Sequence, residues 1–365
     1  EIFIQKANIY SKRDNHEKAV ELLQEALKLT DDYADVYNLI GMEYLFMDNL
    51  EFAKENFIKC LEEDVEDQAA LYNVVYCFEF LDQNKEAIAF LEKYIDRNPY
   101  SEIAWHQSGR LYYGLEDYEN ALRCFDYASM IDDEFMGAFM EKAKAYERLK
   151  KYNEAIESYN RTIELDDATS YALLRIGKCY EKLGNLAKAI QYYNQTVHED
   201  PLLDKGWIAI TDFHLRQKNY QKALFFVNKA LAIDNQNRLY WKRYATINKQ
   251  MNFFEEAEFG FRKAVEFGDY ALDTWLYWVD ILQFLGEFET AIQTLLQASE
   301  YFPEENEIEY RLAGLYFMIQ DNTKAKFHLS NGLRLNFDNY ILIEDLFPVV
   351  WTKKTVKNYI EKHRK

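Results

Sequence analysis

The residue types that most often perform chemistry occur in this sequence, but their spacing gives no catalytic or metal site. The six histidines are scattered, and no two of them are spaced to share one face of a helix. The four cysteines include no C-x-x-C pair, so a zinc knuckle and a thiol redox motif are both excluded. No Gly-rich phosphate loop, G-x-S-x-G or H-E-x-x-H motif occurs. We therefore expect a protein that is not an enzyme and that needs no cofactor or metal.

The strongest signal is an internal period of 34 residues. An alanine recurs at this interval ten times, without insertion or deletion. The aligned alanines are Ala19, Ala53, Ala87, Ala121, Ala155, Ala189, Ala223, Ala257, Ala291 and Ala325. A fixed period of 20 to 50 residues is typical of repeat proteins, in which each unit buries its apolar side against the next.

Each unit resolves into two helices by the spacing of its apolar residues. In the unit from residue 102 to 135, Ala121, Phe125 and Ala128 follow an i, i+4, i+7 pattern. Trp105 and Gly109 begin a similar stripe in the preceding helix, and the segment GLEDYEN supplies the turn. A small residue at the aligned alanine lets two helix axes approach closely, because the large aromatic opposite fills the remaining space.

These units resemble tetratricopeptide repeats, whose pattern is W-x2-L-G-x2-Y, then A-x3-F-x2-A, then P. The residues that carry the resemblance are Trp105, Ser108, Gly109, Tyr112, Ala121, Phe125 and Ala128 in one unit, and Leu173, Ile176, Gly177, Tyr180, Ala189, Tyr193 and Pro201 in another. Asn248 at the tyrosine position and Glu309 at the tryptophan position depart from it. The resemblance implies an all-α fold, a right-handed superhelical solenoid of tandem helix-turn-helix repeats.

The period also sets the expected domain boundaries. Residues 1–339 form ten repeats, the first truncated at its start, and residues 340–365 form capping helices. A terminal repeat needs a polar cap over its exposed apolar face. No such cap precedes the first unit, so we expect further repeats before Glu1 in the natural protein.

In arrays of this family the first helix of each repeat lines a concave groove. With the aligned alanine counted as position 20, positions 2, 5, 6, 9, 12 and 13 are expected to point into it. In the middle five repeats these positions hold eleven bases and four acids, in a chain whose net charge is −19. Towards the N-terminus they hold aromatic residues and Asn instead. The predicted partner-binding residues are Tyr72, Asn73, Tyr76, His106, Arg110, Lys144, Arg175, Lys178, Lys205, Lys242 and Arg243.

The leading functional hypothesis is a cytoplasmic, non-catalytic scaffold or adaptor for protein–protein interaction. Its groove, with a basic middle, would hold a peptide segment of a partner, acidic in the simplest case. The net charge disfavours a nucleic-acid partner, and no stretch of 18 apolar residues could span a membrane. Two alternatives stay open: an RNA-associated helical-repeat protein, suggested by the bases beside Trp241 and Tyr244, or a non-catalytic part of a larger enzyme or of a secretion or assembly complex.

Overall fold

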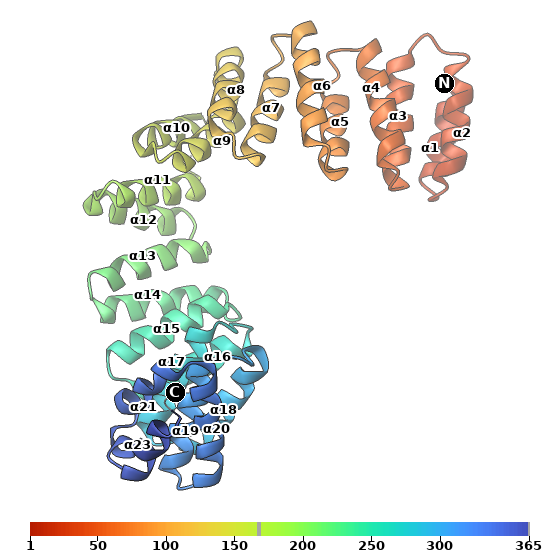
Figure 1. The fold of residues 1–365 in the computed structure, drawn as a ribbon. Helices are drawn as coiled ribbons and strands as arrows, with labels where there is room; N and C mark the ends of the chain where they lie inside the picture. Colours follow the sequence, from red (N-terminus) through yellow and green to blue (C-terminus); the bar gives the residue numbers. More distant parts are fainter. Residues whose placement is uncertain (166–168, 364–365) are drawn as a thin grey trace. The chain divides into compact units, whose positions relative to one another are not determined.

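The chain forms a series of helices joined by short turns (Figure 1). The computed structural model describes residues 1–165 and 169–363, and every regular element in these ranges is a helix. The chain divides into two compact units, Glu1–Tyr192 and Tyr193–Lys365, and each is described by itself. This arrangement confirms the expected all-α helical-repeat fold.

The helices of the first unit alternate between the first and second helix of a repeat. They are α1 (Ile2–Ser11), α2 (His16–Leu27), α3 (Tyr33–Phe46), α4 (Leu50–Glu63), α5 (Gln68–Phe80), α6 (Asn84–Arg97), α7 (Glu102–Gly114), α8 (Tyr118–Ile131), α9 (Met136–Arg148), α10 (Tyr152–Leu165), α11 (Ser170–Lys182) and the first part of α12 (Leu186–Glu199). Odd-numbered helices are the first helices of the repeats, called A helices below, and even-numbered helices are B helices.

The second unit continues the same alternation and adds short helices at its end. It contains the rest of α12, then α13 (Asp204–Arg216), α14 (Tyr220–Ile233), α15 (Arg238–Gln250), α16 (Phe254–Glu266), α17 (Leu272–Leu285), α18 (Phe288–Tyr301), α19 (Asn306–Met318), α20 (Asn322–Leu335), the 3-10 helix η1 (Phe337–Tyr340), α21 (Ile341–Leu346), α22 (Pro348–Trp351) and α23 (Lys354–Glu361).

The aligned alanines hold the two helices of each repeat together. Each is the fourth residue of its B helix, and all ten are fully buried. The A helix contributes a second close approach: a Cβ added at Gly109 would lie 2.5 Å from a ring carbon of Phe125 in the same repeat. The sequence prediction that small residues permit close helix packing opposite large aromatics is therefore confirmed.

The turn from the A helix to the B helix has the same backbone conformation in every repeat. One residue adopts a left-handed φ between 56° and 80°, and the next residue is the N-cap of the B helix. The left-handed residues are Asp14, Asp48, Asp82, Glu116, Lys150, Gly184, Lys218, Asn252, Gly286 and Gln320. Several of the following Asn and Asp residues accept a hydrogen bond from a backbone N–H of the first helical turn, as Asn15 does from Lys18 and Asp117 does from Asn120. This turn fixes where each B helix begins.

Two of the prolines after B helices join neighbouring repeats through a tryptophan. Pro99 and Pro201 each follow a helix end by two residues. The indole N–H of Trp105 donates to the carbonyl of Pro99 at 3.0 Å, and that of Trp207 donates to Pro201 at 2.9 Å. Proline lacks the N–H that a continuing helix would need, so it suits a position just after a helix end. Its carbonyl remains available to the next repeat.

The two departures from the repeat pattern are accommodated locally. Glu309, at a tryptophan position, lies 2.8 Å from the ring nitrogen Nδ1 of His328 and accepts from Asn331 at 3.3 Å, both on α20. Asn248, at a tyrosine position, donates to the carbonyl of Tyr244 at 2.9 Å. Each of these two polar side chains therefore has a partner inside its own repeat.

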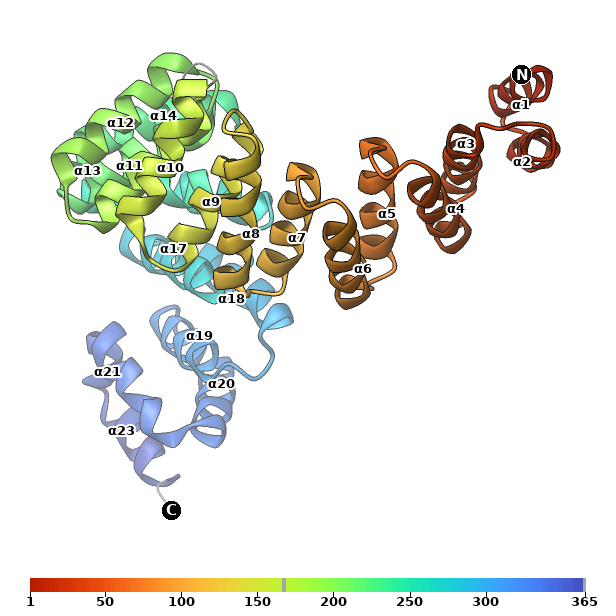
Figure 2. The ribbon, with the colours of Figure 1, turned by 90° about the horizontal axis from the view of Figure 1, so that it is seen from above.

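The residues after α20 cover the last A helix (Figure 2). Figure 2 shows α21 beside α19, and the ring of Phe347, which follows α21, packs directly on Gly314 of α19. Gln283 of α17 also donates to the carbonyl of Leu346 at 2.8 Å. On α23, Val356 and Ile360 are buried. Arg364 and Lys365, at the end of the expected capping segment, lie outside the described residues.

Candidate functional site

The A helices of neighbouring repeats lie side by side in each unit, because polar contacts join one A helix to the next. The amide of Asn73 on α5, for example, lies 3.6 Å from the sulfur of Met42 on α3. We call the surface formed by these helices at the positions listed above the A-helix face. All eleven predicted binding residues lie on A helices, and the structure gives each a different environment.

Large aromatic side chains are exposed on the A-helix face of α3 and α5. Phe46 is 59% and Phe80 is 66% exposed, and the two occupy the same position in consecutive repeats. Tyr72 and Tyr76 are also exposed, and the rings of Tyr76 and Phe80 lie 4.3 Å apart on successive turns of α5. We call Phe46, Tyr72, Tyr76 and Phe80 the aromatic strip. A cluster of solvent-exposed apolar side chains is typical of an interaction surface.

The start of α5 explains how the strip is positioned. Asp67 is the N-cap of α5 and accepts from the backbone N–H of Ala70 at 2.9 Å. The same carboxylate accepts from the amide of Asn38 on α3 at 3.1 Å. One side chain therefore begins α5 and holds it beside α3.

His106 on α7 is not available as a polar contact, contrary to the prediction. Both ring nitrogens are buried and have no hydrogen-bond partner, and the ring lies 4.9 Å from that of Phe135 and 5.8 Å from that of Phe125. Burial lowers the pKa of His106 to about 4 and outweighs the neighbouring charge of Glu141, which acts in the opposite direction. His106 is a neutral packing residue at neutral pH. Its position was predictable from the period, but the aromatic residues around it come from other elements.

Arg110 and Lys144 lie further along the A-helix face of the first unit. Arg110 on α7 lies 3.7 Å from a carboxylate oxygen of Glu79 on α5 and donates to Gln107 at 2.8 Å. Lys144 on α9 donates to Glu141, one turn earlier on the same helix, at 2.7 Å. The contact of Arg110 with Glu79 is long for a charge-assisted hydrogen bond.

Arg175 on α11 is bound to an acid of the preceding repeat. Its Nε and Nη2 atoms donate to the two carboxylate oxygens of Glu147 at 2.8 and 2.6 Å. The hydroxyl of Tyr159, which is fully buried, donates to the same carboxylate at 2.6 Å. Burial alone would lower the pKa of Arg175, but its hydrogen bonds with Glu147 raise it above the ordinary value. This bidentate, partly buried pair joins α9 and α11.

The same contact recurs two and four repeats later. Arg243 on α15 donates to Asp212 on α13 at 2.7 and 3.0 Å, and Arg311 on α19 donates to Asp280 on α17 at 2.5 Å. The arginines occupy one position in alternate repeats, 68 residues apart. Each binds an acid of the preceding A helix. Their common role is to fasten neighbouring repeats.

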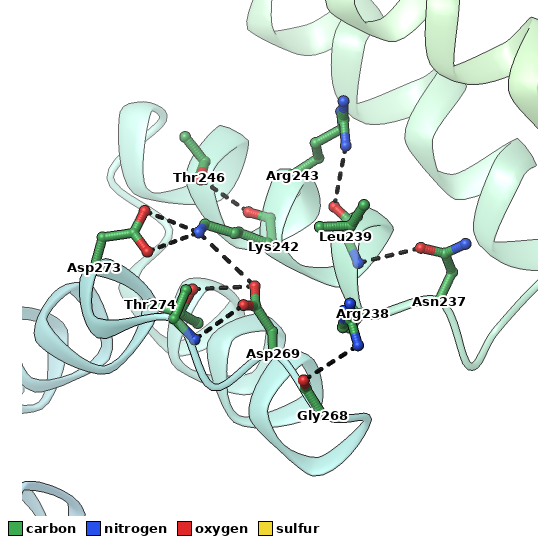
Figure 3. A network of polar contacts seen from close by, with 11 residues as sticks. Asn237, Arg238, Leu239, Lys242, Arg243, Thr246, Gly268, Asp269, Asp273 and Thr274 are labelled. Atoms are coloured by element: carbon green, nitrogen blue, oxygen red, sulfur yellow. Dashed lines mark hydrogen bonds and ion pairs between the residues drawn. The ribbon is translucent and has the colours of Figure 1, made fainter. Parts of the chain in front are cut away.

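Lys242 is held by Asp273 of the next repeat and by Asp269 in the loop that leads to it (Figure 3). Its ammonium donates to both carboxylate oxygens of Asp273 at 3.0 and 2.9 Å and lies 3.8 Å from Asp269. Asp269 is buried and also accepts from the hydroxyl of Thr274 at 3.0 Å. The loop that carries Asp269 turns at Gly268, where φ is +93°. Lys242 therefore anchors this loop and the start of α17.

These pairs correct the expected charge of the A-helix face. The excess of bases was counted over the middle repeats alone, but Glu79 and Asp273 come from the flanking repeats and pair with Arg110 and Lys242. The pairing crosses 28 to 31 residues, so a count within each repeat missed it. Lys178 and Lys205 are exposed on α11 and α13. At least five of the seven bases among the predicted binding residues are therefore paired with carboxylates of the same or a neighbouring repeat.

Metal-ligand side chains do not gather into a group among the residues that the structure describes. No three His, Cys, Asp or Glu side chains in these ranges are placed to hold a metal ion. All four cysteines are buried free thiols, and burial raises the pKa of Cys60 to about 12. Within the described ranges, no helix has the length and apolar character needed to cross a membrane. The indole N–H of Trp241, in the motif that suggested RNA, donates to the carbonyl of Asn235 at 2.8 Å.

The predicted partner-binding residues include none from the C-terminal end, although the basic tail from Lys353 onwards was considered as a contact for an acidic partner or RNA. Two hollows lie beside α20 there, with volumes of about 960 and 500 Å³. The first is lined by Ser330, Leu333, Arg334, Phe337, Asp338, Tyr340, Ile341 and His363, and the second by Asn322, Thr323, Lys326, Phe327, Ser330 and Tyr359. The uneven charge of the chain, discussed below, was the available signal.

Comparisons with known proteins agree with the repeat assignment. Two sequence models of the tetratricopeptide repeat match the chain, one at residues 1–33, 34–64 and 69–101, the other at 106–168 and 140–203. The C-terminal part of a TPR repeat-containing protein from Cytophaga hutchinsonii is similar in structure, with a TM-score of 0.53, 16% identity and coverage of 66% of this chain and 98% of that one. A tetratricopeptide repeat protein from Parabacteroides merdae gives a TM-score of 0.49 at 15% identity over 67% of this chain and 97% of that one.

One curated relative matches a shorter stretch. Anaphase-promoting complex subunit 3 of Schizosaccharomyces pombe is 25% identical over 138 residues, which is 38% of this chain. The match spans about a fifth of the length of that relative, 21%.

Proposed function

Because this chain belongs to the tetratricopeptide repeat family, whose members generally mediate protein–protein interactions, we propose that it is a non-catalytic scaffold that binds a segment of a partner protein on the A-helix face of its first unit. The observation that carries the proposal is the aromatic strip. Its four rings are exposed on α3 and α5 although both helices have other faces buried in the core.

The chemistry of the strip favours a peptide segment as its ligand. Rigid aromatic side chains lose little conformational entropy on binding and supply large apolar contact areas, so they often dominate the energy of an interface. Asn73 lies on the same face of α5, between Tyr72 and Tyr76. Its side-chain amide can bind the main chain of an extended or helical segment while the rings contact alternate side chains.

The bases contribute unequally in this proposal. Arg110 is loosely held by Glu79 at 3.7 Å and can bind a carboxylate of the partner at the edge of the strip. Lys144, Lys178 and Lys205 are secondary contacts. We assign Arg175, Lys242 and Arg243 to the stacking of repeats, because a ligand would have to replace the carboxylates they already bind. A cytoplasmic location agrees with four buried free cysteines, which need no oxidising compartment.

Paired variants and affinity purification of the natural protein test this proposal. The double substitution Tyr76→Ala with Phe80→Ala removes half of the strip, and we expect it to release partners that the wild-type protein retains. The matched control is Phe225→Ala with Phe259→Ala, two exposed phenylalanines on the B helices α14 and α16. If the strip variant retains every partner, or if the control variant loses the same partners, the aromatic strip is not the binding site.

A further inference from the structure

The charge of this acidic chain is distributed unevenly along the sequence. Residues 1–321 contain 58 Asp and Glu against 34 Lys and Arg, whereas residues 322–365 contain four acids against nine bases. The change of sign coincides with the start of α20. The C-terminal end is therefore a basic region on an otherwise acidic protein.

Two bases of this end, Lys326 and Arg334, differ from the paired bases of the A-helix face in their partners. Arg175, Arg243 and Lys242 bind carboxylates of neighbouring repeats. Among residues 1–165 and 169–363, by contrast, no carboxylate forms an ion pair with Lys326 or Arg334. Both side chains are exposed on α20. Their charge is available to a ligand.

These two bases line the hollows beside α20. Arg334 lines the hollow of about 960 Å³ together with Tyr340 and His363. Lys326 lines the hollow of about 500 Å³ together with Tyr359 of α23. Ser330 lines both, so the two hollows adjoin along one side of α20. Together they offer room for several residues of a peptide.

The same site exposes apolar side chains. Phe327 is 63% and Ile341 is 50% exposed, and each lines one of the hollows. The capping helix α21 packs on α19 rather than on this side of α20, and Figure 2 shows α20 and α23 on separate sides of the C-terminal group. Cations beside uncovered apolar groups favour a ligand with both carboxylates and apolar side chains.

We propose that the hollows between α20 and α23 form a second binding site, which takes an acidic segment of a partner protein bearing one or two large apolar side chains. Lys326 and Arg334 bind its carboxylates, and Phe327 and Ile341 contact its apolar groups. Asp338 also lines the larger hollow, and its negative charge disfavours the dense charge of a nucleic-acid backbone. This site is independent of the aromatic strip.

Fluorescence anisotropy with a labelled synthetic peptide tests the proposal. The probe is a 14-residue peptide of Asp and Glu with two Phe residues, and a second peptide replaces every acid by its amide. We expect the acidic peptide to bind the full chain and the amide peptide to bind at least tenfold more weakly. Added salt should strongly weaken the binding of the acidic peptide.

Variants of the chain locate the binding. Lys326→Glu with Arg334→Glu should weaken binding of the acidic peptide at least tenfold, and Phe327→Ser should weaken that binding several-fold. The matched control is Lys59→Glu with Lys85→Glu, which makes the same change in net charge at exposed residues of α4 and α6. Circular dichroism verifies that each variant is folded. The variant Tyr76→Ala with Phe80→Ala should bind the peptide as the wild type does. The proposal for the C-terminal site and the proposal for the aromatic strip can therefore fail separately.

Three results would overturn the proposal. The wild-type chain could fail to bind the acidic peptide, or the Lys326 and Arg334 variant could bind it as tightly as the control does. Sedimentation velocity of the chain alone could instead reveal dimers that this variant abolishes, in which case the occupant is a second copy of the chain.

Discussion

A methyl group added at Gly109 would lie 2.5 Å from the ring of Phe125, closer than two non-bonded carbon atoms can approach. Gly41 and Phe57 stand in the same relationship two repeats earlier. The helices of these repeats therefore pack at a distance that only glycine permits.

This packing gives the first prediction. Gly109→Ala should lower the free energy of unfolding by about 1–3 kcal/mol, because the ring of Phe125 must move out of its packed position. The control is Gly114→Ala in the same helix, where an added Cβ meets nothing within 4 Å. Alanine at residue 114 should raise the free energy of unfolding by up to about 1 kcal/mol, because alanine has a higher helix propensity than glycine. Urea denaturation measures both, and equal effects of the two substitutions would contradict this packing.

The left-handed turn residues give the second prediction. Glu116, Lys150 and Gln320 have φ between 59° and 65°, a conformation that costs a residue with a side chain roughly 1–2 kcal/mol. Replacing each with glycine should raise the melting temperature, by less than that cost implies because glycine also gains entropy in the unfolded chain. Conversely, Gly184→Ala should lower it. A melting temperature that falls in all three glycine variants would show that their side chains make contacts that outweigh the strain.

The pair between Arg175 and Glu147 gives the third prediction. Arg175→Leu leaves the carboxylate of Glu147 partly buried with Tyr159 as its remaining partner, and breaking such a pair costs about 3–5 kcal/mol. The double variant Arg175→Leu with Glu147→Leu should recover much of this loss. Chemical denaturation of the single and double variants measures the coupling. A single variant as stable as the wild type would mean that the pair does not fasten α9 to α11.

The buried ring of His106 gives the fourth prediction, which concerns pH. Its pKa is about 4 in the folded chain and about 6.5 when unfolded, so the unfolded state binds more protons between these values. Stability due to the neutral ring is complete above pH 6.5 and is lost as the pH falls towards 4. His106→Leu should therefore lose less stability than the wild type between pH 7 and 4. Denaturation curves at several pH values measure this difference, and parallel losses in both proteins would contradict the burial of the ring.

The sequence was sufficient for the fold because the repeats are local. The alanine period and the apolar spacing describe contacts inside one repeat, and the buried alanines and the turns before each N-cap lie where the period placed them. The site was predicted less well. That Arg175 reaches Glu147, or Lys242 reaches Asp273, depends on how one repeat stacks on the next. Nor does the period show that Phe135 covers His106.

The central claim is that a partner protein contacts the exposed rings of α5. Its most direct test is photo-crosslinking in cells with p-benzoylphenylalanine placed at residue 76 or, as the matched position on a B helix, at residue 225 of the natural protein. We expect partner adducts from residue 76 and none from residue 225. Adducts of equal strength at both positions, or at residue 225 alone, would contradict it.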